Sequence, residues 1–228
     1  MENVPLRITR NTYCVGGPNL TDSSDCFIYL VNVGGLLILI DAGLGRSIDQ
    51  ILSNIRQVKC KPENIALLVL THEHIDHTGG AAEIKAQLGC QVAAHQIAIP
   101  VITKGDPRVS AAKHYGTSLT PCPVDMSLDG DAGLVPIGNN TLHYVHTPGH
   151  TPGSIVLYFD DGNRRVLFGQ DLHGPFSSEW GSDIDQWCTS MQLVLTLEAD
   201  ILCEGHYGVY RGKSAVRQFI FGLLEQHR

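Results

Sequence analysis

Three histidines and an aspartate lie within six positions, at His72, His74, Asp76 and His77, directly after the apolar run of residues 65–70. Such a run is typical of a buried strand, and loops that follow rigid strands often carry function. In an extended backbone, residues two apart point the same way, so His72 and His74 can reach one ion while Asp76 and His77 turn toward a second. Imidazole and carboxylate suit zinc and iron. The run therefore predicts a metal site, with a solvated polar turn as the alternative.

Three further candidate ligands follow later strands. His150 lies in a rigid Thr-Pro-Gly-His-Thr-Pro-Gly turn, Asp171 ends an apolar run at residues 166–168, and His206 follows residues 201–203. Each alone is weak, because an Asp or His at the end of a strand is commonly a turn or cap residue. Their order and setting together favour a shared site.

The remaining pattern alternates strands and helices without a linker, which predicts one domain over residues 1–228. Thr78 is the expected N-cap of a helix over residues 78–88. Residues 96–123 carry no readable pattern and are interpreted as a lid or insertion beside the site. Residues 27–41 and 155–171 both read as strand, turn, strand and terminal Asp, which hints at two similar halves. Strands are otherwise expected at 91–95, 141–146 and 201–203, and helices at 47–58, 184–197 and 213–226.

The composition of the chain indicates its cellular compartment and limits the kinds of partner it can bind. The seven cysteines are scattered and contain no Cys-x-x-Cys pair, which suggests reduced thiols in a cytoplasm. No secretory signal is expected at the N-terminus, and no apolar run is long enough to cross a membrane. A formal net charge of −7 gives no general attraction to nucleic acid. The expected partner is a small-molecule substrate, with a homodimer left open.

These motifs together resemble the metallo-β-lactamase superfamily, and within it the glyoxalase II-like branch of hydroxyacylglutathione hydrolase-like enzymes. The resemblance rests on five motifs that occur in family order: Asp41 after a strand, the segment His72–His77, His150, Asp171 and His206. It implies an α/β fold, the αβ/βα four-layer sandwich, in which two mixed β-sheets face each other with helices on the outer faces. The metals would lie at one edge of this sandwich.

The resemblance also implies a role for each residue at the site. It assigns three ligands to the first metal: His72, His74 and His150. It assigns three to the second: Asp76, His77 and His206. Asp171 would bridge the two metals, and Asp41 would brace the histidine loop from outside the ligand set.

The function implied is that of a metal-dependent hydrolase with two zinc ions, or alternatively iron or a zinc–iron pair. A hydroxide between the metals would attack a thioester, ester or lactone of a small molecule, and Asp76 would orient that hydroxide. Four residues are candidates for the pocket and for a proton donor: His173, Tyr207, His114 and Tyr115. Trp180, Trp187 and Phe176 either line the pocket, as Tyr207 would, or pack elsewhere.

Several alternatives share this fold. A mononuclear non-heme iron persulfide dioxygenase uses only two His and one Asp, and the larger ligand set found here argues against it. A phosphodiesterase of the same fold stays open, whereas a flavin-linked di-iron reductase or a silent binding module fits the ligand set less well. A typical lactonase often has Tyr where this chain has Gly174. Only 22 residues follow His206, so the helical extension of glyoxalase II proper is not expected.

Overall fold

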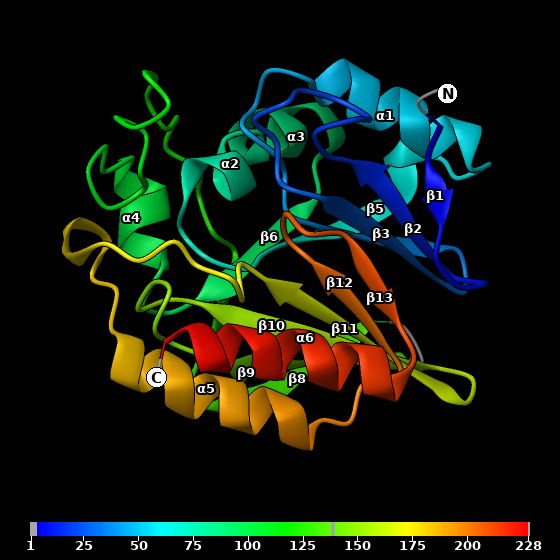
Figure 1. Ribbon diagram of the computed structural model, residues 1–228. Helices are drawn as coiled ribbons and strands as arrows, with labels where there is room; N and C mark the ends of the chain where they lie inside the picture. The colour runs from blue at the N-terminus through cyan, green and yellow to red at the C-terminus, as the bar shows by residue number, and fades with distance from the viewer. Residues whose placement is uncertain (1–3, 138–139, 228) are drawn as a thin grey trace.

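The strands of the computed structural model, which describes residues 4–137 and 140–227, form two mixed sheets that face each other (Figure 1). The first sheet has seven strands in chain order, antiparallel from β1 to β4 and parallel from β4 to β7. Its strands are β1 (Leu6–Arg7), β2 (Thr12–Gly16), β3 (Ile28–Val33), β4 (Leu36–Ile40), β5 (Ile65–Leu70), β6 (Gln91–His95) and β7 (Met126–Leu128).

The second sheet has six strands in the order β13-β12-β11-β10-β9-β8. Only β11 and β12 are parallel, and the other neighbours are antiparallel. Its strands are β8 (Ala132–Ile137), β9 (Asn140–His146), β10 (Ile155–Asp161), β11 (Arg164–Gln170), β12 (Ile201–Glu204) and β13 (Val209–Arg211).

Alternation along the strands sorts their side chains into separate core layers. In β4, Ile38 and Ile40 belong to the cluster between the two sheets, while Leu37 and Leu39 belong to the cluster beneath the helices of the first sheet. This is the period-two pattern of a strand buried on both faces. A third cluster joins the outer face of the second sheet to its own helices.

Helices cover both outer faces (Figure 1). Helices α1 (Ile48–Gln57) and α3 (Ala81–Leu88) pack on the first sheet, and α5 (Ile184–Thr196) and α6 (Lys213–Gln226) pack on the second. The apolar face predicted for α1 is buried at Ile48, Ile51, Leu52 and Ile55. The predicted αβ/βα sandwich of two mixed sheets is therefore confirmed.

The two sheets share a local arrangement. In the first, the β3–β4 hairpin lies beside the parallel strand β5, and in the second, the β10–β11 hairpin lies beside the parallel strand β12. Asp41 follows β4, and Asp171 follows β11. The two halves are similar in this respect, as the sequence indicated. Their shared arrangement brings the loops after corresponding strands to one edge of the sandwich.

The helix expected over residues 78–88 begins three residues later than predicted, and Thr78 is not its N-cap. Helix α2 (Ile75–Thr78) ends at Thr78, and α3 begins after Gly80. The hydroxyl of Thr78 donates instead to the carbonyl oxygen of His74 at 2.9 Å. A Cβ at Gly79 would lie 2.3 Å from the carbonyl oxygen of Leu44, so this close approach of two backbones requires glycine here.

The segment 96–123 contains α4 (Ile99–Lys104) followed by turns. The short 3-10 helices η1 (Pro62–Asn64) and η2 (Ser178–Trp180) complete the described elements. Among the helices of the described residues, none is long and apolar enough to cross a membrane.

Candidate metal centre

All seven predicted metal ligands lie at one edge of the sandwich. The loop after β5 supplies His72, His74, Asp76 and His77, while the second sheet supplies the other three. These are His150 between β9 and β10, Asp171 after β11, and His206 after β12. Residues from both halves therefore meet in space, although 134 positions separate the first from the last in the sequence (206 − 72).

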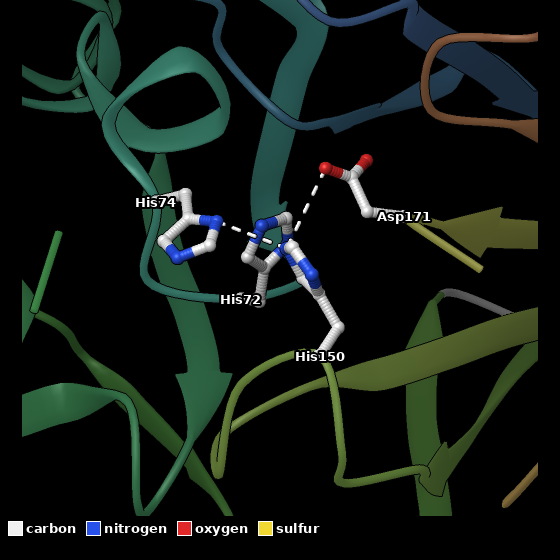
Figure 2. Close-up of side chains that lie close together, drawn as sticks. All are labelled: His72, His74, His150 and Asp171. Atoms are coloured by element: carbon white, nitrogen blue, oxygen red, sulfur yellow. Dashed lines mark hydrogen bonds and ion pairs between the residues drawn. The ribbon is translucent and has the colours of Figure 1, made fainter. Parts of the chain in front are cut away.

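The first group contains His72, His74, His150 and Asp171, all buried, and their ligand atoms lie within 4.8 Å of one another. His150 Nε2 lies 2.9 Å from His74 Nδ1 and 3.5 Å from Asp171 Oδ2. Figure 2 shows the three imidazoles and the carboxylate gathered around a common point. Nitrogen and carboxylate donors in this arrangement are a ligand set that suits zinc.

The second group contains Asp76, His77, Asp171 and His206, again with ligand atoms within 4.8 Å of one another. His77 Nε2 lies 3.1 Å from Asp171 Oδ1 and 3.3 Å from His206 Nε2. His206 Nε2 lies 3.2 Å from Asp76 Oδ2. The set therefore offers two imidazole nitrogens and two carboxylates to one point.

Asp171 belongs to both groups, and its two oxygens face different neighbours. Oδ2 is the oxygen near His150, and Oδ1 is the oxygen near His77 and His206. A Cβ at position 205 would lie 2.3 Å from Asp171 Oδ1, so Gly205 leaves the space that this carboxylate occupies. One carboxylate between two ligand groups is the arrangement expected of a bridging ligand.

Asp41 lies behind the histidine loop. Its Oδ2 is 2.7 Å from His77 Nδ1, and its Oδ1 accepts the backbone N–H of Thr71 at 2.8 Å. The backbone of Asp41 is left-handed, with φ of 64°, a conformation that Asp adopts more readily than most residues. The carboxylate thereby directs Nε2 of His77 toward Asp171.

A third group, Cys26 with Asp41 and His77, also lies within 4.8 Å. Asp41 already occupies Nδ1 of His77, and burial raises the pKa of the Cys26 thiol. A neutral thiol is a poor metal ligand. This group is therefore interpreted as support for the second group and not as a separate site.

The charges at the centre fit a bound cation. Burial lowers the pKa of His74 to about 3, and burial with the neighbouring histidines lowers that of His72 well below its usual value. Burial acts to lower the pKa of His206, but the carboxylates Asp171 and Asp76 raise it to about 10. Among the described residues, the buried His72 Nε2 has no hydrogen-bond partner. Neutral imidazoles and an orphaned ring nitrogen in the first group, and carboxylates that favour a positive charge in the second, are what a metal would satisfy.

Further buried contacts hold the ligand loops. His150 Nδ1 lies 2.8 Å from the carbonyl oxygen of Pro175, which fixes the orientation of the ring. Glu73 accepts a hydrogen bond from Thr151 at 2.9 Å, and burial raises the pKa of Glu73 to about 7. Glu204 lies 2.8 Å from His173 Nδ1. The sequence analysis did not single out either glutamate. Glu204 could have been noticed, because it is an acidic residue that ends an otherwise apolar strand.

A pocket of about 390 Å³ opens directly onto this centre. All four predicted pocket candidates line it, and segment 96–123 contributes to its wall. The lining residues are His74, Asp76, Ala111, His114, Tyr115, Asp171, His173, Pro175, Trp180, His206 and Tyr207. Segment 96–123 therefore lies beside the site, as the sequence predicted.

The aromatic residues that the sequence left undecided separate into two kinds. Trp180 lines the pocket, with its ring centroid 4.8 Å from that of His74. Trp187 is 1% exposed and packs in the core of the second sheet with Phe176 beside it. Trp187 therefore packs in the protein interior, because the amphipathic face of α5 turns it toward the sheet, and the partly buried Phe176 packs against it.

Comparison with known proteins points to one family. Residues 22–206 match the metallo-beta-lactamase superfamily. YflN of Bacillus subtilis, named a probable metallo-hydrolase, is 28% identical over 82% of this chain and 81% of its own length. The human acyl-coenzyme A thioesterase MBLAC2 is 32% identical over 64% of this chain and 57% of its own. The metallo-beta-lactamase GOB-18 of Elizabethkingia meningoseptica superposes with a TM-score of 0.81 and 25% identity, covering 98% of this chain and 88% of that one.

Proposed function

Because the chain belongs to the metallo-β-lactamase superfamily, we propose that it is a hydrolase with two metal ions that cleaves a thioester, ester or lactone of a small molecule. The observation that carries this proposal is the position of Asp171, whose two oxygens face two separate buried ligand groups. A mononuclear site would need only one of these groups.

In this proposal each group holds one ion, and we favour zinc because the donors are mainly imidazole nitrogens. The first ion would be held by His72, His74 and His150. The second would be held by Asp76, His77 and His206, with Asp171 between them and Asp41 fixing His77. When bound, such a pair supplies a Lewis acid and a nucleophilic water near neutral pH.

The protein's own contribution begins with Asp76. Its Oδ2 lies 3.2 Å from His206, and the side chain also borders the pocket. The carboxylate can accept a hydrogen bond from the attacking water and thereby aim a lone pair at the substrate carbonyl. Positioning of this kind removes much of the entropic part of a barrier.

The pocket walls favour an apolar acyl group. Trp180 presents its ring beside His74, and Tyr207, which is 63% exposed, lies with its ring centroid 4.6 Å from that of His173. Aromatic walls with a few polar groups are typical of small-molecule sites. His114, Tyr115, His173 and Tyr207 are the residues placed to hydrogen-bond a leaving group.

Within this substrate range we favour a thioester, the reaction type of the glyoxalase II-like branch. A thiol ionises near pH 8.5, so a thiolate leaves without needing a proton at that moment. An alkoxide leaving group does need one. The human thioesterase among the relatives supports the same choice.

The test combines metal analysis with a matched substrate pair. Protein purified without added metal is expected to contain about two zinc ions per chain. A chelator should abolish hydrolysis of a phenylacetyl thioester, and added zinc should restore it. The oxygen ester with the same acyl group is expected to react more slowly, because only its leaving group needs a proton.

Other results would redirect or end the proposal. About one iron per chain without zinc, together with oxygen consumption on a persulfide substrate, would contradict the hydrolase with two metals. Two zinc ions with turnover of a phosphodiester but of no thioester, ester or lactone would keep the metal centre and reject the substrate class.

A further inference from the structure

Two glutamates that are not in the proposed ligand set are buried beside it, Glu73 at 1% exposure and Glu204 at 0%. We propose that each metal position has its own positioning glutamate. Glu73 would hold the group around His72, His74 and His150, and Glu204 would hold the group around His206. This inference rests on the proposed two-metal centre and adds residues that act on it through the ligand loops.

Glu73 stands between two ligands, yet its side chain serves a different loop. Glu73 belongs to neither ligand group, and its carboxylate contacts the turn after His150 instead. Its Oε2 accepts the hydroxyl hydrogen of Thr151 at 2.9 Å, and Thr151 directly follows His150. One carboxylate thus ties the loop after β5 to the loop after β9, and these two loops carry the three histidines of the first group.

The surroundings of Glu73 leave little freedom for this contact. A Cβ at Gly153 would lie 2.6 Å from Glu73 Oε2, so the turn after His150 closes directly over the carboxylate. Thr151 Oγ1 also lies 2.9 Å from Ser154 Oγ, which extends the network along the same turn. Burying a carboxyl is costly unless it is hydrogen-bonded. Its placement here is explained if it sets the distance between the two loops.

Glu204 makes the corresponding contacts in the second group. Its Oε2 accepts the backbone N–H of His206 at 2.7 Å and that of Tyr207 at 2.8 Å. Its Oε1 lies 2.8 Å from Nδ1 of His173, which stands two residues after Asp171. The carboxylate therefore fixes the turn that presents His206 and links it to the loop that presents Asp171.

The two sets of contacts do not overlap. Glu73 bonds to the turn that follows His150, whereas Glu204 bonds to residues 173, 206 and 207. Interactions without shared partners are usually close to additive. Glu204 reaches Asp171, the ligand that both positions share, only through the loop of His173. Removing either glutamate is therefore expected to weaken its own metal position much more than the other.

The experiment measures zinc affinity by competition with a chromophoric chelator, in proteins where only one position is complete. In a His206→Ala background, Glu73→Ala should weaken the remaining zinc about 10–100-fold, and Glu204→Ala should change it less than about threefold. In a His74→Ala background the order should reverse. No turnover is needed for this readout.

Conservative variants separate positioning from general damage. Glu73→Gln keeps an oxygen that accepts from Thr151 and should restore most of the affinity, whereas Thr151→Val should behave like Glu73→Ala. Glu225→Ala, at an exposed position of α6, is the matched control and should bind zinc as the parent does. If Glu73→Ala fails to fold by circular dichroism, Thr151→Val is the substitute for that position. If Glu204→Ala fails to fold, His173→Ala, which removes the partner of Glu204 Oε1, is the substitute and should weaken the second position.

The outcomes distinguish this inference from the function it rests on. Wild-type protein that does not bind two ions would overturn both. Wild-type protein that binds two ions, with glutamate variants that either bind as the parent does or weaken both positions equally, would overturn the positioning roles alone. Selective loss that follows the background, with rescue by Gln at position 73, is the expected result.

Discussion

The two sheets supply the centre in different ways. The first sheet supplies four candidate ligands from one stretch after β5, whereas the second supplies one residue from each of three separate loops. In the first half, local backbone geometry brings His72 and His74 together. In the second half, convergence depends on the register of the sheet, since the parallel pairing of β11 with β12 sets Gln170 opposite Glu204. The ligands of the first half therefore form a local sequence motif, whereas those of the second half are brought together only by tertiary structure.

Removing the residue shared by both groups should have the largest effect. Asp171→Ala takes a ligand from each group at once, so we expect both ions to be lost. Without the Lewis acid and the activated water, kcat/KM should fall about 10⁴-fold, or roughly 5.5 kcal/mol. Elemental analysis and thioester hydrolysis measure the two effects.

The control for this change is Asp49→Ala, at an exposed position of α1. It should keep both ions and full activity. If the Asp171→Ala protein retained one tightly held ion and a tenth or more of the activity, the two halves would act independently, and the bridging role of Asp171 would be wrong.

The candidate site could be predicted more completely than the fold that carries it. The stretch from His72 to His77 is readable because its residues are adjacent, and the later three because each follows an apolar strand. β5 and α6 were predicted at the bounds that the structure gives, 65–70 and 213–226. In these elements burial imposes a continuous or helical apolar pattern, which the sequence displays directly.

Two of the elements that escaped prediction are very short strands at sheet edges. β1 has two residues and both are exposed, and β13 has three residues with none fully buried. Such strands are fixed by pairing with distant partners, which no local pattern reveals. The same holds for the contact of Glu73 with Thr151, 78 positions away in the sequence, and for that of Glu204 with His173, 31 positions away.

A core substitution in each half tests whether the ligands of the second half depend more on tertiary packing than those of the first. Leu68 in β5 and Leu202 in β12 are both 0% exposed, each in the layer beneath its own helices. Leu→Ala at either position should cost about 2–5 kcal/mol of unfolding free energy, measured by denaturant titration. Zinc affinity, however, should fall more for Leu202→Ala, since the ligands of that half depend on strand register.

Equal losses of zinc affinity in the two variants would contradict the contrast. A Cβ at Gly169 would lie 2.6 Å from Leu202 Cδ1, so Leu202 packs close to the backbone that leads to Asp171, and a cavity there disturbs two ligand loops. Leu193→Ala, at an exposed position of α5, is the matched control for both variants and should change neither quantity appreciably.

The smallest expected effect concerns helix capping, compared between α5 in the second half and α1 in the first. In the second half, the Asp183 side chain caps α5 by accepting the backbone N–H of Gln186 at 2.9 Å. In the first half, the N-cap Ser47 of α1 makes no side-chain cap bond. Asp183→Ala should therefore lower Tm by about 2–4 °C, and Ser47→Ala by about 1 °C or less. Asp183→Asn keeps an acceptor oxygen and should restore most of the loss, so equal melting shifts for Asp183→Ala and Ser47→Ala would show that side-chain capping does not distinguish the two halves.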